Sequence, residues 1–182
     1  MIYVFLAEGF EEVEALTPVD LLRRAGKNVQ IVGVGGNVIK GSHGINVQTD
    51  MTVNEMTLGN DLEMIVLPGG MPGTLNLEKS EAVQTAIDFC NERNIYIGAI
   101  CAAPSILGHL GLLHGREAIC YMGFEKELNG ATISKHSVAR DGHIITAQGA
   151  GVAVAFGLKL AEVFVGADKA KALSAGICYP EH

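Results

Sequence analysis

Short apolar runs alternate along the chain with segments in which apolar residues recur at helical spacing. An unbroken apolar run is typical of a strand buried on both faces, whereas recurrence at every third or fourth position is typical of a helix packed on one side. The expected strands are Ile2–Ala7, Asn28–Val34, Glu63–Leu67 and Ile95–Ile100. The expected helices are Glu11–Ala25, Ser80–Arg93, Pro104–Leu110 and Gly149–Val165, with a last turn or two at Asp168–Ser174.

This alternation predicts a doubly wound α/β sandwich, in which a mostly parallel sheet carries helices on both faces. Two hairpins are expected to interrupt it. The first pairs Val38–Lys40 with Ile45–Thr49 around a turn at Ser42–Gly44, and the second pairs Ser137–Ala139 with His143–Thr146 around Asp141-Gly142.

Two residues refine the expected helices. Pro18 lies inside the first one, where its missing N–H predicts a kink or a break into two pieces. Ser80 begins the second and is expected to be its N-cap, because a serine hydroxyl accepts a hydrogen bond from a free N–H of the first turn.

The composition predicts one soluble domain over residues 1–182. Hydrophobic residues make up 48% of the chain and the mean hydropathy is +0.29, which is too apolar for a disordered chain. The formal net charge of −7 and the lack of a basic run argue against binding to nucleic-acid phosphates or anionic lipid. No apolar run reaches the roughly 18–20 residues of a membrane span.

The cysteines indicate a reducing compartment. Cys90, Cys101, Cys120 and Cys178 are widely spaced, without a C-x-x-C pair or neighbouring paired histidines, which argues against a structural metal site. The run Ile2–Ala7 is too short for the core of a signal peptide, and no basic residue precedes it. We therefore expect a cytoplasmic protein that needs no metal or other cofactor.

Cys101 directly follows an expected strand and precedes an expected helix. A residue at such a turn is held out of the sheet on a strained backbone, as in the nucleophile elbow of hydrolases. The N-terminus of the following helix points free N–H groups at the sulfur, which predicts a lowered thiol pKa and a reactive thiolate. The alternative is that Cys101 is a small core residue, as we expect for Cys90 and Cys120.

Two further segments carry candidate chemistry near the carboxyl ends of strands, where such sheets bind ligands. The turn Leu67-Pro68-Gly69-Gly70 can present the Gly70 N–H which, together with the Ala102 N–H, would form an oxyanion hole beside Cys101. The alternative is an ordinary turn. Glu14 lies one turn into the first expected helix, and if it is partly buried its pKa rises, so that it can hold a proton for the sulfur or a substrate oxygen.

Other motifs are weaker. The glycine spacing of Gly36–Ser42 is that of a phosphate loop, but the required lysine is missing, and no G-x-G-x-x-G follows the first strand. The six histidines are scattered, so we expect surface or structural roles for them rather than a metal cluster.

Taken together, the conspicuous residues form an ordered set across almost the whole chain. They are Ala7-Glu8-Gly9-Phe10-Glu11-Glu12-Val13-Glu14, Pro18-Val19-Asp20, Arg23-Arg24-Ala25-Gly26, Leu67–Gly70, Ala99–Pro104 and Gly149-x-Gly151. In this order and spacing they resemble the ThiJ/PfpI superfamily, and within it the branch of the human parkinsonism-associated deglycase and its bacterial relatives. The resemblance implies a flavodoxin-like sandwich, usually a homodimer, with a reactive cysteine at the elbow.

The resemblance also implies roles for individual residues. Cys101 matches the family's nucleophile, and Glu14 matches the glutamic acid that hydrogen-bonds to its sulfur. Gly70 and Ala102 match the positions whose N–H groups line the pocket. We therefore predict Cys101 and Glu14 as catalytic residues and Gly69, Gly70, Ala102 and Tyr121 as residues that contact the oxyanion or the substrate.

The chain departs from the family's pattern at several positions. Ala102 stands where the protease-like branch has a histidine, so a Cys–His protease dyad is unsupported. Tyr121 stands where some relatives carry a pocket histidine, which leaves Glu14 as the general acid/base. His43 stands where relatives can have an arginine near the dimer interface, so a charge there would depend on pH. Gly149-Ala150-Gly151-Val152 replaces the usual Gly-Pro-Gly-Thr, which alters that wall of the pocket.

The leading hypothesis is a cysteine-dependent glyoxalase or deglycase that acts without glutathione on 2-oxoaldehydes or their early glycation adducts. In it, a Cys101 hemithioacetal forms and Glu14 shuttles the proton that converts it to a thioester, which water hydrolyses. The alternative is a redox-sensing stress protein or holdase chaperone that uses oxidation of Cys101. An amidase or peptidase is a third hypothesis, which Ala102 disfavours.

Overall fold

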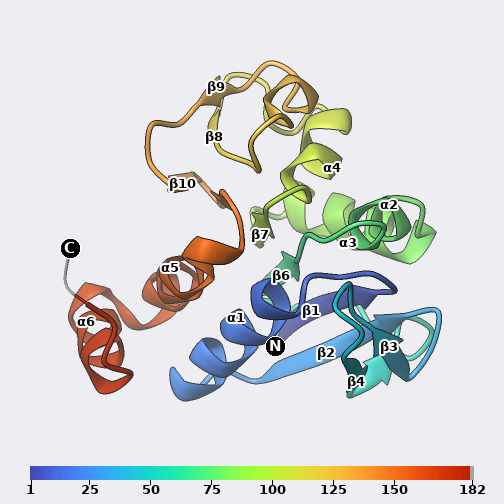
Figure 1. The fold of residues 1–182 in the computed structure, drawn as a ribbon, viewed down its shortest axis with the longest axis horizontal. Coiled ribbons are helices and arrows are strands. Elements are labelled where there is room, and N and C mark those ends of the chain that lie inside the picture. Colours follow the sequence, from blue (N-terminus) through green and yellow to red (C-terminus); the bar gives the residue numbers. More distant parts are fainter. Residues whose placement is uncertain (181–182) are drawn as a thin grey trace.

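A seven-stranded sheet forms the centre of the computed structural model, which describes residues 1–180 (Figure 1). Its strands are β1 (Ile2–Ala7), β2 (Val29–Val34), β5 (Met51–Thr52), β6 (Met64–Leu67), β7 (Tyr96–Ile100), β10 (Val138–Asp141) and β11 (Ile144–Ala147), in the order β10-β11-β7-β6-β1-β2-β5. All neighbouring pairs are parallel except β10 with β11. The order β2-β1-β6-β7-β11 is flavodoxin-like, so the predicted fold class is confirmed.

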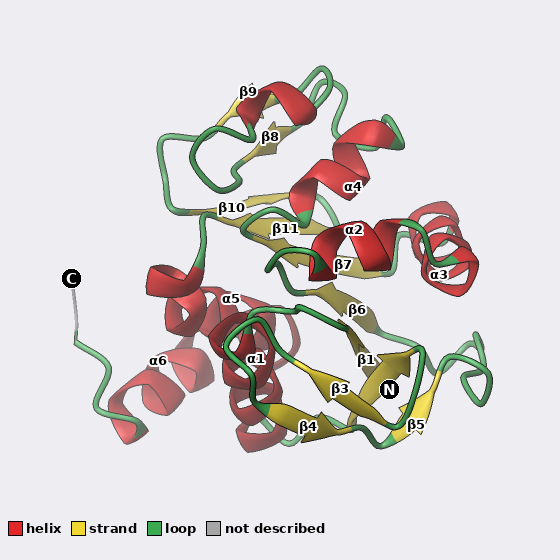
Figure 2. Cartoon of the chain, turned by 45° about the vertical axis from the view of Figure 1, so that its right-hand side comes forward, coloured by secondary structure: helices red, strands yellow, loops and turns green. Residues whose placement is uncertain are grey.

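Helices cover both faces of this sheet (Figure 2). One side carries α1 (Glu12–Arg24), α5 (Ala153–Val165) and α6 (Ala167–Gly176), and the other carries α2 (Gly73–Glu78), α3 (Glu81–Glu92) and α4 (Pro104–His109). Alternate residues of β1 belong to two separate cores: Ile2, Val4 and Leu6 lie in one, and Tyr3, Phe5 and Ala7 in the other. A strand that faces two cores must be apolar at every position, which explains the unbroken apolar run.

The structure also contains the two predicted hairpins and a further pair of short strands, and only the second hairpin belongs to the central sheet. β3 (Val38–Lys40) and β4 (Asn46–Gln48) form the first predicted hairpin, and β10 pairs with β11 in the second, where Gly142 turns the chain with φ 61°. β8 (Glu117–Ala118) and β9 (Thr132–Ile133) pair in parallel, with the 3-10 turn η1 (Glu125–Glu127) between them along the chain. In residues 1–180, no helix has the length and apolar character needed to cross a membrane.

Pro18 does not divide α1, which runs without interruption from Glu12 to Arg24, so the predicted break is wrong. Pro18 is buried where α1 packs closely on α5: a Cβ on Gly157 would lie 3.3 Å from the Pro18 Cα and 2.6 Å from a methyl carbon of Leu21. This close contact holds α1 in one piece, although the proline costs one backbone hydrogen bond.

Other differences concern the ends of elements and short segments. α5 begins at Ala153 rather than Gly149, because Ala150–Val152 form a 3-10 turn, η2. The last turn or two expected at Asp168–Ser174 proves to be a complete helix, α6, which spans Ala167–Gly176. The sequence pattern missed α2 and β5, which are too short to show a period. Ser80 caps α3 as predicted, and its Oγ accepts a hydrogen bond from the Val83 N–H at 3.4 Å.

Candidate active site

The carboxyl ends of three adjacent strands meet at one edge of the sheet, and each leads into a candidate residue. β1 continues into α1, which carries Glu14. β6 ends just before Gly69 and Gly70, and β7 ends just before Cys101. β1 lies next to β6, and β6 lies next to β7. The order of the sheet reverses between β1 and β6, which is where sheets of this type bind ligands.

Cys101 has the strained backbone predicted for the elbow. Its φ of 64° lies in the left-handed region, which a non-glycine residue rarely adopts. Two hydrogen bonds hold it there: its N–H donates to the Ala147 carbonyl at 2.9 Å, and its carbonyl accepts from the Tyr121 N–H at 2.8 Å. Cys101 is partly exposed, whereas Cys90 and Cys120 are buried, so the elbow cysteine is the most accessible of these three.

Glu14 lies directly beside this sulfur. Its side chain is buried and hydrogen-bonds to Cys101, and its Oε2 accepts the Gly69 N–H at 3.0 Å. A Cβ on Gly69 would lie 2.6 Å from the Cys101 Cβ and 2.6 Å from Glu14 Oε2. Only glycine therefore allows the turn after β6 to approach both the carboxyl and the cysteine this closely.

The electrostatics of this pair differ from the prediction for the cysteine. Burial raises the pKa of Glu14 to about 7, although hydrogen bonds from Cys101 and the Gly69 N–H lower it. The pKa of Cys101 is raised to about 12, first by burial and then by the negative charge of Glu14. Hydrogen bonds from the Gly70 and Ala102 N–H groups lower it by less. The predicted lowered thiol pKa is wrong, because two backbone donors do not outweigh burial and a facing carboxylate.

The raised pKa of Glu14 shows how a thiolate can still form here. The ionised Glu14 carboxylate repels a thiolate, but a protonated carboxyl removes the repulsion and donates a hydrogen bond to the sulfur. A proton that moves from Cys101 to Glu14 leaves the charge of the pair unchanged. The two groups therefore titrate as a pair that holds one negative charge above its first pKa.

Tyr121 lies on the wall of a cavity of about 290 Å³ next to this pair. The cavity is lined by Tyr121, Met122, Gln148, Gly149, Ala150, Gly151 and Val152. A Cβ on Gly149 would lie 3.4 Å from a ring carbon of Tyr121 and 3.9 Å from Glu14 Oε1, so Gly149 is close to both side chains. The structure thus brings Cys101, Glu14, Gly69, Gly70, Ala102 and Tyr121 together at one edge of the sheet.

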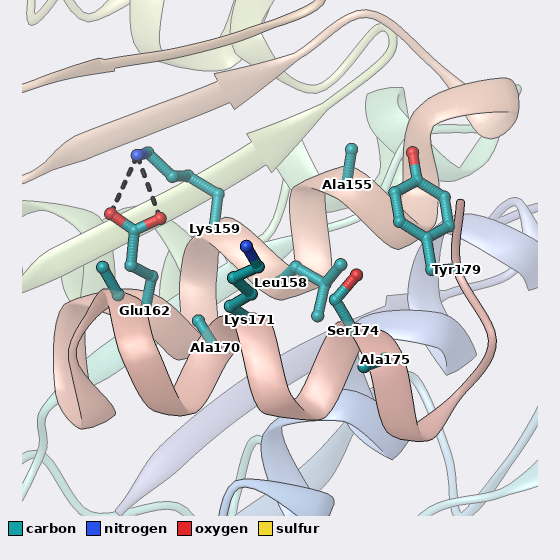
Figure 3. Close-up of a pocket in the computed structure, with 10 residues that line it drawn as sticks. Ala155, Leu158, Lys159, Glu162, Ala170, Lys171, Ser174, Ala175 and Tyr179 are labelled. Atoms are coloured by element: carbon teal, nitrogen blue, oxygen red, sulfur yellow. Dashed lines mark hydrogen bonds and ion pairs between the residues drawn. The ribbon is translucent and has the colours of Figure 1, made fainter. Parts of the chain in front are cut away.

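A larger cavity lies elsewhere. It measures about 530 Å³ and lies between α5 and α6, where Lys159 Nζ donates to both carboxylate oxygens of Glu162 at 3.1 and 3.2 Å (Figure 3). None of the six candidate residues lines it. Cavity size alone therefore does not locate the site.

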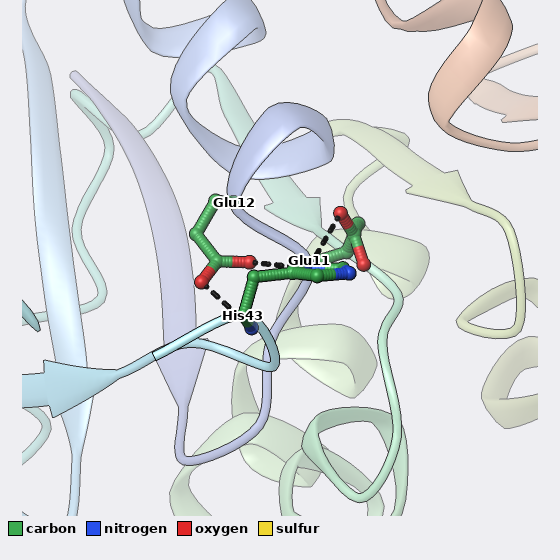
Figure 4. A group of neighbouring side chains, drawn as sticks. All are labelled: Glu11, Glu12 and His43. Carbon is green, nitrogen blue, oxygen red and sulfur yellow. Dashed lines mark hydrogen bonds and ion pairs between the residues drawn. The ribbon is translucent and has the colours of Figure 1, made fainter. Parts of the chain in front are cut away.

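Glu12 has a structural role that the sequence did not reveal. Its buried carboxylate accepts the N–H groups of His43 at 2.9 Å and Ile45 at 3.3 Å, and the His43 Nδ1 lies 3.2 Å from Oε2 (Figure 4). Burial raises the pKa of Glu12, but these hydrogen bonds and that of its own backbone outweigh it and hold the pKa below its usual value. Glu12 thereby ties the β3–β4 turn to the start of α1.

These contacts also bring together atoms of a kind that can bind a metal ion, although we expected the histidines to be scattered without a metal cluster. One atom each from Glu11, Glu12 and His43 lies within 4.8 Å of the others. The Glu12 carboxylate already accepts backbone donors, and it anchors the loop. No sequence signal could have revealed this grouping, because His43 is far from the glutamates along the chain.

Comparison with known proteins identifies the family. Residues 1–163 match the profile of the DJ-1/PfpI family. The chain belongs to the DJ-1/PfpI family. It is 32% identical to protein dj-1beta of Drosophila melanogaster over 177 residues, which are 96% of this chain and 94% of that protein. It is 31% identical over 145 residues to the protein named Deglycase PfpI of Pyrococcus furiosus, covering 78% of this chain and 86% of that one.

A solved DJ-1/PfpI structure shows the same fold. The structure titled "Toxoplasma gondii DJ-1, oxidized" matches with a TM-score of 0.91 at 31% identity, covering 99% of this chain and 98% of that one. The resemblance inferred from the ordered motifs is therefore confirmed at the level of family and fold.

Proposed function

We propose that this DJ-1/PfpI protein is a cysteine-dependent, glutathione-independent glyoxalase or deglycase that acts on 2-oxoaldehydes or their early glycation adducts. The observation that carries the proposal is the Glu14–Cys101 pair: a buried carboxyl with a raised pKa, hydrogen-bonded to the thiol of a partly exposed cysteine. The Gly70 and Ala102 N–H groups at the sulfur add donors for an oxyanion. The relative named Deglycase PfpI supports this class of reaction.

The reaction begins when the Cys101 proton moves to Glu14. The thiolate attacks the aldehyde carbon, a C–S bond forms, and the carbonyl electron pair moves to an oxygen that the Gly70 and Ala102 N–H groups stabilise. Glu14 returns its proton to this oxygen, which gives a hemithioacetal.

The second half is an internal redox step followed by hydrolysis. The Glu14 carboxylate removes the proton from the hemithioacetal carbon and delivers it to the neighbouring carbon, while the hydroxyl proton passes to the ketone oxygen. The ketone is thereby reduced to an alcohol, and the aldehyde carbon becomes a thioester. Water then cleaves the C–S bond, releases a 2-hydroxy acid and restores the thiol. Water is the one co-reactant that this balance requires. A Cys–His dyad is not proposed, because Ala102 follows the cysteine.

The test is lactate formation from methylglyoxal without glutathione. We expect lactate from the wild type and from Cys178→Ser, whose exposed thiol lies outside the site, and none from Cys101→Ser. The proposal would be refuted if Cys101→Ser forms lactate at the wild-type rate. It would also be refuted if the wild type forms no lactate at high enzyme concentration.

A second candidate function uses the same sulfur as a redox sensor in a stress protein or holdase chaperone. It is favoured by the exposure of Cys101 and by the Glu14 carboxyl, which can donate a hydrogen bond to an oxidised sulfur. The Toxoplasma gondii relative is described as oxidized, which is a property of that protein.

We also propose that the chain forms a homodimer and works in a reducing, cytoplasmic setting. Val13, Val38 and Ile45 expose 49%, 59% and 54% of their surface, which supplies apolar area that a second copy of the chain could cover. All four cysteines are free. Light scattering after size exclusion should give twice the mass of the chain, and a monomer at micromolar concentration would contradict the dimer.

A further inference from the structure

His109 ends α4 and lies between two carboxylates that come from different segments. Its Nδ1 is 2.5 Å from Glu78 Oε1 in α2, and its Nε2 is 2.9 Å from Glu127 Oε2 in η1. A carboxylate oxygen accepts and never donates, so both ring nitrogens must carry a proton. His109 is therefore an imidazolium in this arrangement, and the hydrogen bonds that it donates to Glu78 and then to Glu127 raise its pKa.

Each of the three joined segments is fastened at its start to a residue of the candidate site. In α2, the Thr74 N–H donates to the Gly70 carbonyl at 2.9 Å. At the start of α4, the Ser105 hydroxyl donates to the Ala102 carbonyl at 2.7 Å. Before η1, the Phe124 N–H donates to the Tyr121 carbonyl at 3.0 Å, and the Tyr121 N–H donates to Cys101.

Side-chain packing between these segments is uneven. α4 and η1 touch backbone to backbone, because a Cβ on Gly108 would lie 2.0 Å from the Glu127 carbonyl oxygen. Between α2 and η1 there is instead a cavity of about 250 Å³, with Met71, Leu75 and Phe124 among its walls. The Thr74 hydroxyl, which belongs to a residue on this cavity, has no hydrogen-bond partner in the described part of the chain. Hence His109 bridges α2 and η1 where packing is incomplete.

We propose that His109 is a positioning residue: as an imidazolium it clamps α2, α4 and η1 together and so makes the placement of Gly70, Cys101 and Tyr121 depend on pH. Loss of one proton turns one ring nitrogen into an acceptor that faces a carboxylate, and that contact becomes repulsive. Glu78 and Glu127 are the ionisable groups that line the cavity beside His109. The Glu127 side chain is 51% exposed and that of Glu78 is 28% exposed, so Glu127 is the carboxylate that moves away from the neutral His109 ring.

The chain offers variants that separate charge from mere bulk. His109→Arg keeps a permanent cation with several donors, His109→Gln removes the charge, and His114→Gln alters an exposed histidine on the loop after α4. NMR titration of the Gly70 and Tyr121 amides is the direct readout. It is made in a Glu14→Gln background, which removes the titration of the Glu14–Cys101 pair.

We expect the chemical shifts of both amides to change with pH at the same midpoint as those of the His109 ring. The control His114→Gln should show the same midpoint. With His109→Arg they should stay at their low-pH positions, and with His109→Gln at their high-pH positions. The clamp would be overturned if the Gly70 and Tyr121 amide shifts do not change with pH while the His109 ring titrates. Identical spectra for His109→Arg and His109→Gln would overturn it as well.

An activity readout rests on the proposed function. At the pH of the wild-type maximum, kcat/KM for methylglyoxal should fall about tenfold in His109→Gln and stay near wild type in His109→Arg, because a small misplacement of reacting groups is costly. A wild type without glyoxalase activity would refute the proposed function and leave the NMR result to decide the clamp. An active enzyme with equal losses in both variants would refute the clamp alone.

Discussion

The buried carboxyl of Glu14 and the thiol of Cys101 hydrogen-bond to each other, with the backbone of Gly69 against both. α1 carries the acid and the elbow after β7 carries the sulfur, so the pair exists only in the folded sheet. Because burial raises the pKa of both groups, the pair carries at most one negative charge near neutral pH. Its chemistry depends on which atom holds that charge.

The thiolate content of the pair should rise with pH through about 7 and then level off. Below this value both groups are protonated, and above it the shared charge resides partly on sulfur until the second proton leaves near the raised pKa of Cys101. Mass spectrometry of Cys101 alkylation by iodoacetamide measures this, in His109→Arg to remove the titration of His109. In Glu14→Gln the step near 7 should vanish, and a step that persists there would assign it to another group.

Glu14 should make the protein less stable as the pH rises. Its pKa is 4.5 in the unfolded chain and about 7 in the folded one, so its contribution is fully present below 4.5 and is lost as the pH rises through about 7. Relative to the wild type, Glu14→Gln should gain up to about 3 kcal/mol in the free energy of unfolding between pH 4.5 and 8. Urea unfolding measures the gain, with the exposed Asp88→Asn as control. A gain that does not change with pH would contradict the linkage.

Family membership, fold and the meeting of the site residues could be predicted from the sequence, because they depend on strand order and on which residues follow each strand. The strained φ of Cys101 also follows from its place between a strand and a helix. The sign of the Cys101 pKa shift could not be predicted, since it depends on how deeply the fold buries the thiol and on the charge of the facing Glu14. The Glu12–His43 and His109–Glu127 contacts could not be predicted either, because each joins two segments that no periodic pattern connects.

Gly69→Ala should disable the site without removing a functional group. Its Cβ would lie 2.6 Å from both the Cys101 Cβ and Glu14 Oε2, so the carboxyl and the thiol must move apart. We expect at least about a 100-fold loss of kcat/KM for methylglyoxal, as a displacement of about 1 Å can cause. Gly176→Ala is the control, because a Cβ there meets nothing within 4 Å. Wild-type activity in Gly69→Ala would show that the close contact is not required.

Cys101 should be the first cysteine to gain oxygen under mild peroxide at pH 8. Cys90 and Cys120 are buried, and burial raises the pKa of each thiol to about 12. Cys178 is more exposed than Cys101, so exposure alone predicts that Cys178 reacts first. The Gly70 and Ala102 donors and a carboxyl that accepts the thiol proton favour Cys101 instead.

Peptide mass spectrometry at increasing peroxide concentrations separates these two expectations. Glu14→Gln should slow oxidation of Cys101 and leave Cys178 unchanged, which makes Cys178 an internal reference within each sample. If Cys178 reacts first, or if Glu14→Gln leaves the order unchanged, the carboxyl does not activate the sulfur. The redox function would then lose its structural basis, while the lactate assay would still decide the enzymatic one.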